Sequence, residues 1–478
     1  MITQQAADVM DEKEEYDCFI KNYPAYAATA ALDDLRAKDY ARLDEQDQVY
    51  LDYTGGGLYA ASQIQKHMEL LAKGVFGNPH SSNPTSQAAT QLDEHARAYI
   101  LHYFNANPEN YLVVFTANAS GALKLLGESY PFAPDGKYLL TFDNHNSVNG
   151  IREFAQRGGA TVLYSPVLPP DLRVDAARLE ANLDQIVPGS DNLFAFPAQS
   201  NFSGVQHDLG WIERAQAKGW DVLLDAAAFA PTNRLDLSQH QPDFVSLSFY
   251  KIFGYPTGIG ALIARKDKIG KLRRPWFAGG TITIATVTAQ KHYLHDGSEG
   301  FEDGTIDYLN LPGVEIGLRH IENVGIDPIH ARVVSLTGWL LDQLSELQHS
   351  NGMAVVRIYG PTTTEMRGGT ISLNFYDPHG TIIDYRHIEQ LANQRNISLR
   401  TGCFCNPGAG ETALGLTETE LNCALEEQQR MTLPELMIVL GRVLGALRIS
   451  VGIASNFADV YRFMQFTRLF VDQAADAL

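Results

Sequence analysis

Cysteine is scarce in this sequence. Only four cysteines occur among 478 residues, at positions 18, 403, 405 and 423. A secreted chain that relied on disulfides would need a larger and more regularly spaced set. The sequence therefore predicts no disulfide framework, and a reducing cytoplasm is the expected setting.

Positive charge and long hydrophobic runs are also in short supply. The chain has 37 Lys and Arg against 56 Asp and Glu, a formal net charge of -19. Such an acidic surface repels nucleic acids and anionic membranes, although a local basic pocket stays compatible with it. No segment is long enough to span a bilayer, and the first residues lack the basic and apolar parts of a secretory signal. We therefore expect no nucleic-acid partner, no membrane attachment and no secretion.

What the sequence does contain is ample core material, with 45% hydrophobic and 19% charged residues. Short apolar runs lie near residues 113, 139, 162, 194, 223, 246 and 262, and they alternate mostly with helical stretches. This alternation predicts an α/β fold with a mainly parallel sheet and with ligand groups at the carboxyl ends of its strands. After residue 270 the pattern changes. A long helix over 311–347 and strands near 355–359 and 370–375 predict a second, smaller α/β unit.

One lysine stands out in the apolar pattern. A buried-strand run ends at Phe249, and Lys251 follows in a turn rich in glycine and proline, before a second apolar run over 261–264. A lysine between buried strands is costly unless it is neutralised, paired or used covalently. The alternative is that Lys251 only leaves the strand end for solvent. The hydroxyls around it, which would suit an anionic ligand, belong to Ser246, Ser248, Tyr250 and Thr257.

Upstream, the apolar run 219–224 ends in Asp225 and is followed by three alanines. A strand-end aspartate followed by a strand-end lysine is the pair that pyridoxal phosphate chemistry needs. The lysine forms a Schiff base with the cofactor, and the aspartate keeps the pyridine nitrogen protonated. This pairing favours a covalent role for Lys251.

Other strand ends carry further candidate ligand groups. The strand at 111–115 leads through small residues into a helix whose first turn contains Ser120, an arrangement that binds phosphate, although an ordinary βα turn would look similar. His145 follows the strand at 138–142 and could lie over an aromatic cofactor ring. Gln199 and Asn201 follow the strand at 193–196, and their amides could reach a ring oxygen.

Cys403 and Cys405 lie in a turn just after Arg400. A metal site would need two more ligands at suitable spacing, which the sequence does not supply. A disulfide between residues two apart would be strained. The remaining interpretation is a mobile loop that offers a reactive thiol, with Arg400 binding a substrate carboxylate.

Together these stretches resemble the class V branch of the fold-type-I pyridoxal phosphate enzymes. Within that branch they are most similar to the cysteine-desulfurase-like domain of the molybdenum cofactor sulfurases. The similar motifs lie in the same order between residues 50 and 460, at 115–117, 196–204, 248–258, 301–305 and 400–406. The resemblance implies a fold-type-I architecture, divided here into an amino-terminal arm (1–48) that packs on the small domain, a large cofactor-binding domain (49–308) and a small domain (309–478).

The resemblance also implies roles for single residues. Lys251 would be the Schiff-base lysine, Asp225 the partner of the pyridine nitrogen, and Cys405 the thiol that takes the sulfur. Arg400 would hold the carboxylate of L-cysteine. The remaining expected cofactor or substrate contacts are His145 stacked on the ring, Asn201 near the substrate, and Ala119, Ser120, Ser248 and Tyr250 at the phosphate. A homodimer is implied too, in which a loop from the neighbour, 279–281 with Thr281 or 304–305, completes each site.

Departures from the family pattern leave alternatives open. Ala228 stands where desulfurases generally have a glutamine, so the ring oxygen needs another donor, for which Gln199 and Asn201 are the candidates. Tyr250 replaces a frequent histidine, as is common in the molybdenum cofactor branch. The chain also stops near the end of the cofactor-binding domain, which suggests a stand-alone sulfur donor or a relative with another reaction. The predicted function is a cysteine desulfurase or sulfurase. One alternative is a β-eliminating carbon–sulfur lyase or another amino-acid-modifying enzyme of class V. The other is a sulfur-carrier or scaffold protein that binds the cofactor without turnover.

Overall fold

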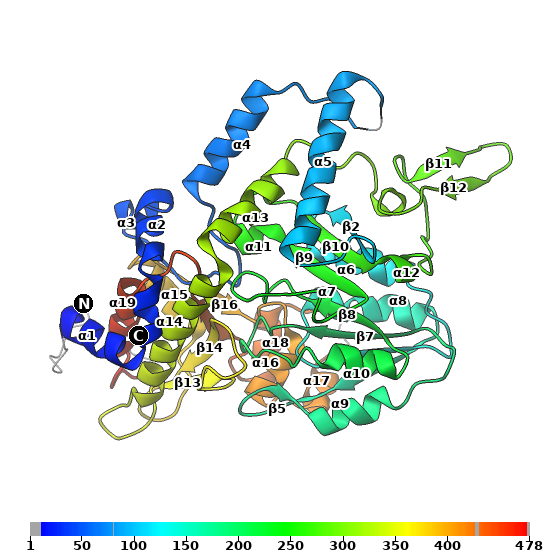
Figure 1. Cartoon of the computed structure of the whole chain (residues 1–478). Coiled ribbons are helices and arrows are strands. Elements are labelled where there is room, and N and C mark those ends of the chain that lie inside the picture. Colours follow the sequence, from blue (N-terminus) through cyan, green and yellow to red (C-terminus); the bar gives the residue numbers. More distant parts are fainter. Residues whose placement is uncertain (1–10, 80, 426–429, 476–478) are drawn as a thin grey trace.

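A seven-stranded sheet lies at the centre of the larger part of the protein (Figure 1). The structure is a computed structural model that describes residues 11–79, 81–425 and 430–475. The strand order is β2-β10-β9-β8-β7-β3-β4, and all neighbours are parallel except β10, which is antiparallel to both β2 and β9. All seven predicted strands are present. Their bounds are β2 (Tyr111–Thr116), β3 (Lys137–Thr141), β4 (Thr161–Ser165), β7 (Asn192–Pro197), β8 (Asp221–Asp225), β9 (Phe244–Ser248) and β10 (Gly260–Arg265).

Both faces of this sheet are apolar. Successive side chains of a strand point to opposite sides, and these buried strands are apolar at nearly every position. In β8, Val222 and Leu224 belong to one hydrophobic cluster and Leu223 to the other. Helices cover both faces and fill most connections between strands. They are α5 (Pro84–Tyr103), α6 (Ala119–Ser129), α7 (Asn146–Asn149), α8 (Ile151–Arg157), α9 (Ala176–Leu183), α10 (Trp211–Ala217), α11 (Phe249–Phe253) and α12 (Lys266–Ile269), with the short pair β5 (Val167–Leu168) and β6 (Arg173–Val174).

The carboxy-terminal part forms a second sheet of four antiparallel strands in the order β13-β14-β17-β16. The prediction of a single helix over 311–347 is wrong in one respect. This stretch forms two helices, α13 (Pro312–Val324) and α14 (Ile326–Glu346). Gly325 separates them, because its φ of +90° is incompatible with a continuous helix. The other elements are β13 (Val356–Tyr359), β14 (Thr370–Phe375), α15 (Tyr385–Asn393), β15 (Ile397–Ser398), β16 (Arg400–Gly402), α16 (Pro407–Leu414), α17 (Glu418–Leu425), α18 (Leu433–Leu440), β17 (Ala446–Ser450) and α19 (Phe457–Arg468).

Amino-terminal elements contact this carboxy-terminal part. Arg36 forms a buried ion pair with Asp459 of α19, and Arg332 of α14 binds Asp33 at 2.6 Å. The strand β1 (Val49–Tyr50) pairs in parallel with β15. The remaining elements before β2 are α1 (Glu12–Asn22), the 3-10 helix η1 (Pro24–Thr29), α2 (Ala31–Asp39), α3 (Arg42–Glu45) and α4 (Ala61–Lys73).

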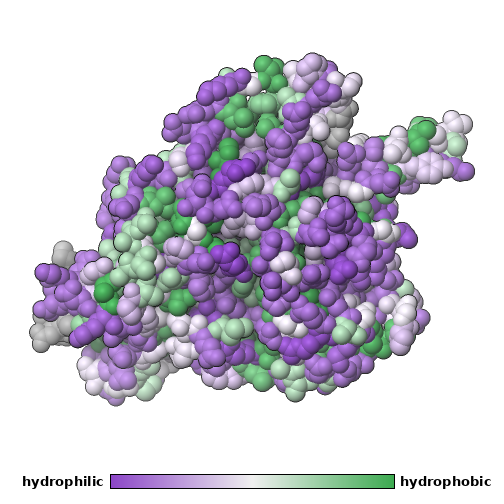
Figure 2. Space-filling view, in the orientation of Figure 1, coloured by the Kyte–Doolittle hydropathy of each residue, from purple (hydrophilic) through white to green (hydrophobic). Residues whose placement is uncertain are grey.

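A hairpin of β11 (Ile282–Ala285) and β12 (His292–Leu294) projects from the large sheet, ahead of the 3-10 helix η2 (Glu299–Phe301) (Figure 1). Its apolar side chains are exposed: Val287 is 94% and Tyr293 62% accessible to solvent. Hydrophobic atoms are visible near its end in Figure 2. Among the described residues, no helix combines the length and apolar character needed to cross a membrane.

Candidate functional site

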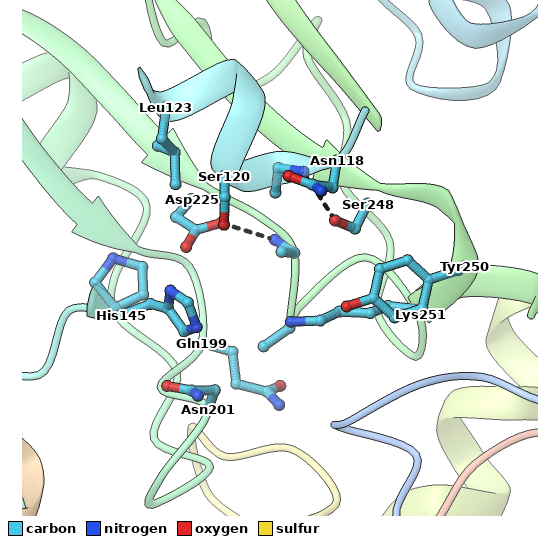
Figure 3. Close-up of a pocket in the computed structure, with 14 residues that line it drawn as sticks. Asn118, Ser120, Leu123, His145, Gln199, Asn201, Asp225, Ser248, Tyr250 and Lys251 are labelled. Atoms are coloured by element: carbon cyan, nitrogen blue, oxygen red, sulfur yellow. Dashed lines mark hydrogen bonds between the residues drawn. The ribbon is translucent and has the colours of Figure 1, made fainter. Parts of the chain in front are cut away.

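A cleft of about 180 Å³ opens at the carboxyl ends of the large-sheet strands (Figure 3). Most of the residues predicted for the site line it. They are Ala119, Ser120, His145, Gln199, Asn201, Asp225, Ser248, Tyr250 and Lys251, joined by Asn118, Leu123, Pro197, Ala227 and Ala228. Asn118 and Lys251 are more than 130 positions apart in the sequence, yet both line the cleft. They meet because the carboxyl ends of parallel strands lie at one edge of the sheet.

Lys251 projects into the cleft from α11, directly after β9 (Figure 3). The backbone around it is packed closely, since a side chain at Gly57 would approach the Lys251 carbonyl oxygen to 2.8 Å. Burial lowers the pKa of the Lys251 amine, while the nearby Asp225 carboxylate acts in the opposite direction. A lowered pKa enlarges the neutral, nucleophilic fraction of this amine.

Asp225 ends β8 and is 8% exposed. Its Oδ1 accepts hydrogen bonds from the Ser246 hydroxyl at 2.9 Å and from the Ala227 backbone N–H at 3.1 Å. The other carboxylate oxygen accepts no hydrogen bond from any described residue. A carboxylate held by one oxygen with its second oxygen available suits an N–H group of a ligand.

The start of α6 provides an anion-binding corner. Asn118 caps the helix by accepting from the Gly121 N–H, and the Ala119 N–H donates to the Ser248 hydroxyl at 2.9 Å. Ser120 is exposed toward the cleft, and its hydroxyl lies 2.6 Å from that of Ser147. This group of hydroxyls at a helix N-terminus is a suitable receptor for a phosphate.

His145 caps α7 and lines the cleft. Its Nδ1 accepts a hydrogen bond from the Ser147 N–H at 3.1 Å, which leaves the ring proton on Nε2. Burial lowers the pKa of His145, and Lys251 and Arg448 lower it further, against the opposing effect of Asp225. The lowered pKa favours the neutral imidazole.

The loop with the two cysteines is anchored beside the cleft. Cys405 is exposed, with a φ of +54°, and Phe404 before it is buried with a φ of +51°. The Cys405 carbonyl accepts from the Asn146 N–H at 2.6 Å. This hydrogen bond ties the backbone of the loop to the start of α7, while the thiol stays accessible. Burial and the neighbouring Cys405 raise the pKa of the Cys403 thiol.

Asn201 was predicted to lie near the substrate, and it lines the cleft while its side chain also contacts the cysteine loop. Its amide nitrogen donates to the Phe404 carbonyl at 2.7 Å, and its amide oxygen accepts from the Asn406 side chain at 2.9 Å. Both polar atoms therefore hold the cysteine loop, although the residue also lines the cleft.

Arg400 is half exposed and does not point freely at the cleft. It makes a forked ion pair with Asp52, with its closest contact at 2.6 Å. A second arginine, Arg448 of β17, was missed by the sequence prediction. It is 3% exposed, donates to Asp52 at 3.2 Å and to the Asn201 carbonyl at 2.9 Å, and its Nε has no hydrogen-bond partner among the described residues.

The positive charge of Arg448 acts on two titratable side chains of the cleft. It contributes to the pKa shifts of both His145 and Lys251, and burial lowers its own pKa to about 10, so that it stays protonated at pH 7. Its sequence signal was weak, because the run Ala446–Ser450 looks like a core strand with one charged interruption.

Thr281 does not lie in this cleft. It is fully buried, and its hydroxyl donates to the Ala278 carbonyl at 2.9 Å. Within one chain the predicted contact of Thr281 with the cofactor is therefore absent from the residues that the structure describes.

The donor set of the cleft fits pyridoxal phosphate. An anion corner, a lysine with lowered pKa and a carboxylate with one available oxygen match the phosphate, the aldehyde and the pyridine nitrogen of that cofactor. Among the described residues, no group of three or more His, Cys, Asp or Glu side chains is placed to hold a metal ion.

Comparison with known proteins agrees with this geometry. The family model "Aminotransferase class-V" matches residues 49–463. The chain is 36% identical to a molybdenum cofactor sulfurase of Solanum lycopersicum, covering 96% of this chain and 60% of that protein. It is also 36% identical to the molybdenum cofactor sulfurase of Homo sapiens, over 91% of this chain and 51% of that protein. The chain thus spans only about half to three fifths of these curated relatives.

Solved structures share the fold. A cysteine desulfurase from Thermococcus onnurineus NA1 superimposes with a TM-score of 0.75 at 23% identity, covering 92% of this chain and 97% of that one. The cystine C–S lyase C-DES, solved with its product cysteine persulfide, superimposes with a TM-score of 0.67 at 18% identity, covering 89% and 98%. The arrangement of helices and strands is therefore common to desulfurases and at least one lyase.

Proposed function

Because the chain belongs to the class-V aminotransferase family, we propose that it is a pyridoxal-phosphate-dependent cysteine desulfurase. It moves sulfur from L-cysteine to Cys405 as a persulfide and releases alanine. The observation that carries this proposal is an exposed thiol whose loop is anchored at a cleft containing a lysine of lowered pKa.

Four parts of the cleft would hold the cofactor. The N-terminus of α6, with Ser120, Ser248 and Tyr250, would bind the phosphate, and Asp225 would keep the ring nitrogen protonated. Lys251 would bind the cofactor covalently until substrate arrives. When bound, pyridoxal phosphate supplies an electron sink for the carbon atoms of the amino acid.

The carboxylate of L-cysteine would bind to the arginines beside the cleft. Arg400 is half exposed and paired with Asp52, a partner that the substrate carboxylate would replace. Arg448 is buried and shares Asp52, and its Nε, unpartnered among the described residues, is inaccessible to solvent. Arg400 would therefore make the direct contact, and the charge of Arg448 would support it.

Proton transfer falls to Lys251 and His145. The released Lys251 amine, with its pKa lowered by burial, can take the α-proton of the substrate. His145 carries its proton on Nε2 and can donate a hydrogen bond into the cleft.

Sulfur transfer follows from the position of Cys405. Its thiolate attacks the substrate sulfur, forming an S–S bond while the substrate C–S bond breaks. The electron pair of the C–S bond stays with the carbon fragment, which takes up a proton and leaves as alanine. The enzyme retains the sulfur as a Cys405 persulfide, and an acceptor molecule with a nucleophilic group then removes it.

A carbon–sulfur lyase is the second candidate, because the lyase C-DES shares the fold. The outcomes differ chemically: a desulfurase gives alanine and a protein persulfide, and a lyase gives pyruvate and a sulfur compound in solution. A protein that binds the cofactor without turnover would give neither. The anchored, exposed Cys405 favours the desulfurase.

The test is to incubate the protein, purified with pyridoxal phosphate, with L-cysteine. Alanine and an added sulfur on the protein support the proposal. Pyruvate without an added sulfur would assign the lyase, and absence of any product would assign the scaffold. Borohydride reduction before substrate is added should attach the cofactor to Lys251, and labelling of another lysine would contradict the site.

A homodimer completes the proposal. The projecting hairpin exposes Ile284, Val287 and Tyr293, which suits burial against a second copy. The loop at 279–281 lies just before this hairpin, so dimerisation would bring it to the neighbour's phosphate corner. Light scattering of wild type and Val287→Asp tests the dimer, since the variant should dissociate more readily.

The sulfur acceptor is a separate protein or cofactor, and the four free cysteines support a cytoplasmic setting.

A further inference from the structure

Two arginines share one carboxylate beside the cleft. The carboxylate of Asp52 accepts from Nε of Arg400 at 3.0 and 3.1 Å and from Nη2 of the same side chain at 2.6 Å. Its Oδ1 also accepts from Nη2 of Arg448 at 3.2 Å. One negative charge therefore serves two positive charges, and these three side chains keep one positive charge in excess. A second carboxylate would neutralise that excess.

The turn that begins at Asp52 packs against the lysine of the cleft. The Gly57 N–H donates to the Tyr250 carbonyl at 3.0 Å, and a side chain at Gly57 would approach the Lys251 carbonyl to 2.8 Å. Burial raises the pKa of the cleft residue Tyr250, Arg400 lowers it, and Asp52 raises it further. The shared carboxylate is therefore close enough to the cleft to act on its side chains.

Two members of this group are fixed and one is not. Asp52 is buried and forms a β-bridge with Ser450. Arg448 is 3% exposed and donates to the Asn201 carbonyl at 2.9 Å. Arg400 lies on the edge strand β16, its side chain is 50% exposed, and in the described part of the chain Asp52 is its only hydrogen-bond partner. Arg400 is thus the member that can leave Asp52.

We propose that Asp52 competes with the carboxylate of an amino-acid ligand for Arg400, and so determines how tightly and how selectively the cleft binds such ligands. The inference rests on the proposed function, because it concerns the substrate of that reaction. The incoming carboxylate takes Arg400 from Asp52, and Asp52 keeps Arg448. Two carboxylates then face two guanidinium groups, and no buried charge loses its last partner. A ligand without a carboxylate cannot make this exchange.

The test compares L-alanine, the product, with ethylamine, which is the same molecule without the carboxylate. Calorimetry measures the binding of each to protein loaded with pyridoxal phosphate. In Asp52→Asn the amide oxygen can still accept from Arg448, but the amide nitrogen cannot accept from Arg400. We expect L-alanine to bind about tenfold more tightly and ethylamine to bind as before. Asp267→Asn removes an exposed ion pair with Arg265, at the end of β10 away from the cleft, and as the matched control should change neither value.

A second variant opens the same ion pair without removing a charge. A side chain at Gly55 would approach both Nη2 of Arg400 and the Asp52 carboxylate to 2.5 Å. Gly55 does not have a positive φ, so its backbone accepts alanine. We expect Gly55→Ala to bind L-alanine more tightly too. Gly270→Ala is the control, because the added carbon would meet no atom within 4 Å.

The outcomes separate this inference from the proposed function. Unchanged L-alanine binding in both variants would show that Asp52 does not compete, and a tenfold loss in Asp52→Asn would show that Asp52 instead holds Arg400 in place for the ligand. An equal gain for ethylamine would mean that the carboxylate is not what is recognised. Each of these results overturns the inference, while the desulfurase proposal stands if wild type releases alanine from L-cysteine. If wild type releases none, yet Asp52→Asn binds L-alanine more tightly as expected, the inference stands and the proposed function fails.

Discussion

The side-chain amide of Asn201 donates to the carbonyl oxygen of Phe404 across 2.7 Å, and this bond joins the large sheet to the residue just before Cys405. Phe404 and Cys405 both have positive φ values, which for residues with side chains cost about 1 to 3 kcal/mol each and persist only where the surroundings impose them. The surroundings here include Asn201, which is therefore a positioning residue for the thiol.

The first prediction follows from that contact. In Asn201→Asp the carboxylate has no N–H for the Phe404 carbonyl, so the loop should relax and the thiol should lose its alignment. We expect persulfide formation to slow about tenfold or more. The absorbance of the bound cofactor should stay normal. Rapid-quench mass spectrometry measures the first quantity and a spectrum the second. Asn393→Asp, at an exposed position on α15, is the control. An unchanged rate in Asn201→Asp would contradict the positioning role.

The second prediction concerns Asp225. Asp225→Asn can still accept from Ser246 but carries no charge to keep the ring nitrogen protonated. We expect turnover of L-cysteine to fall about 100-fold, with little change in the fold. Steady-state alanine production and circular dichroism test this. Near-normal turnover would show that Asp225 does not face the ring nitrogen.

The third prediction separates the two thiols. Cys405 is exposed, whereas Cys403 is partly buried and has a raised pKa, which leaves less thiolate at neutral pH. Cys405→Ser should therefore abolish the added sulfur that mass spectrometry detects after L-cysteine, and Cys403→Ser should retain it. The reverse pattern would assign the persulfide to Cys403. If neither change affects release of alanine or pyruvate, the lyase interpretation takes over.

The sequence predicted the large sheet well because each strand is a short apolar run that ends in polar residues. Lys251 and Asp225 were predicted in the same way, as single charges at the ends of buried strands, and both line the cleft. The partners of Arg400 and Asn201 could not be predicted, since Asp52 lies 348 positions from Arg400 and Phe404 lies 203 from Asn201. Such pairs depend on how the two sheets pack, which local pattern does not encode. Arg448 was missed for the same reason.

The side-chain hydrogen bonds of Gln199 and Asn201 show a finer limit. Both residues were candidates for a donor to the ring oxygen, and the sequence indicates no partner for either amide. In the structure the Gln199 oxygen accepts from Gln206 and Asn233, and one N–H of Asn201 donates to the Phe404 carbonyl.

The last prediction concerns stability and pH. Asp93 of α5 is 2% exposed, and neither of its carboxylate oxygens has a hydrogen-bond partner among the described residues. Burial raises its pKa to about 7, helped by Glu302, while Arg97 opposes the rise. The folded protein therefore binds a proton that the unfolded chain has already lost between about pH 4 and pH 7. The contribution of Asp93 to the free energy of unfolding must then fall as the pH rises through this range.

Asp93→Asn removes the charge and should be more stable than wild type at pH 8, by about 2 to 4 kcal/mol, because wild type must there either bury an unpaired carboxylate or take up a proton that the unfolded chain has lost. At pH 4 the two proteins should differ by less than about 1 kcal/mol, since Asp93 is then fully protonated in the folded state and still about half protonated in the unfolded state. Urea unfolding at the two pH values measures the difference. Asp135→Asn, in an exposed turn, should show no such pH-dependent gain. If Asp93→Asn were instead destabilised at pH 8, the carboxylate would have to be held by Arg97 in its charged form, and the folded-state pKa of Asp93 would lie below its usual value.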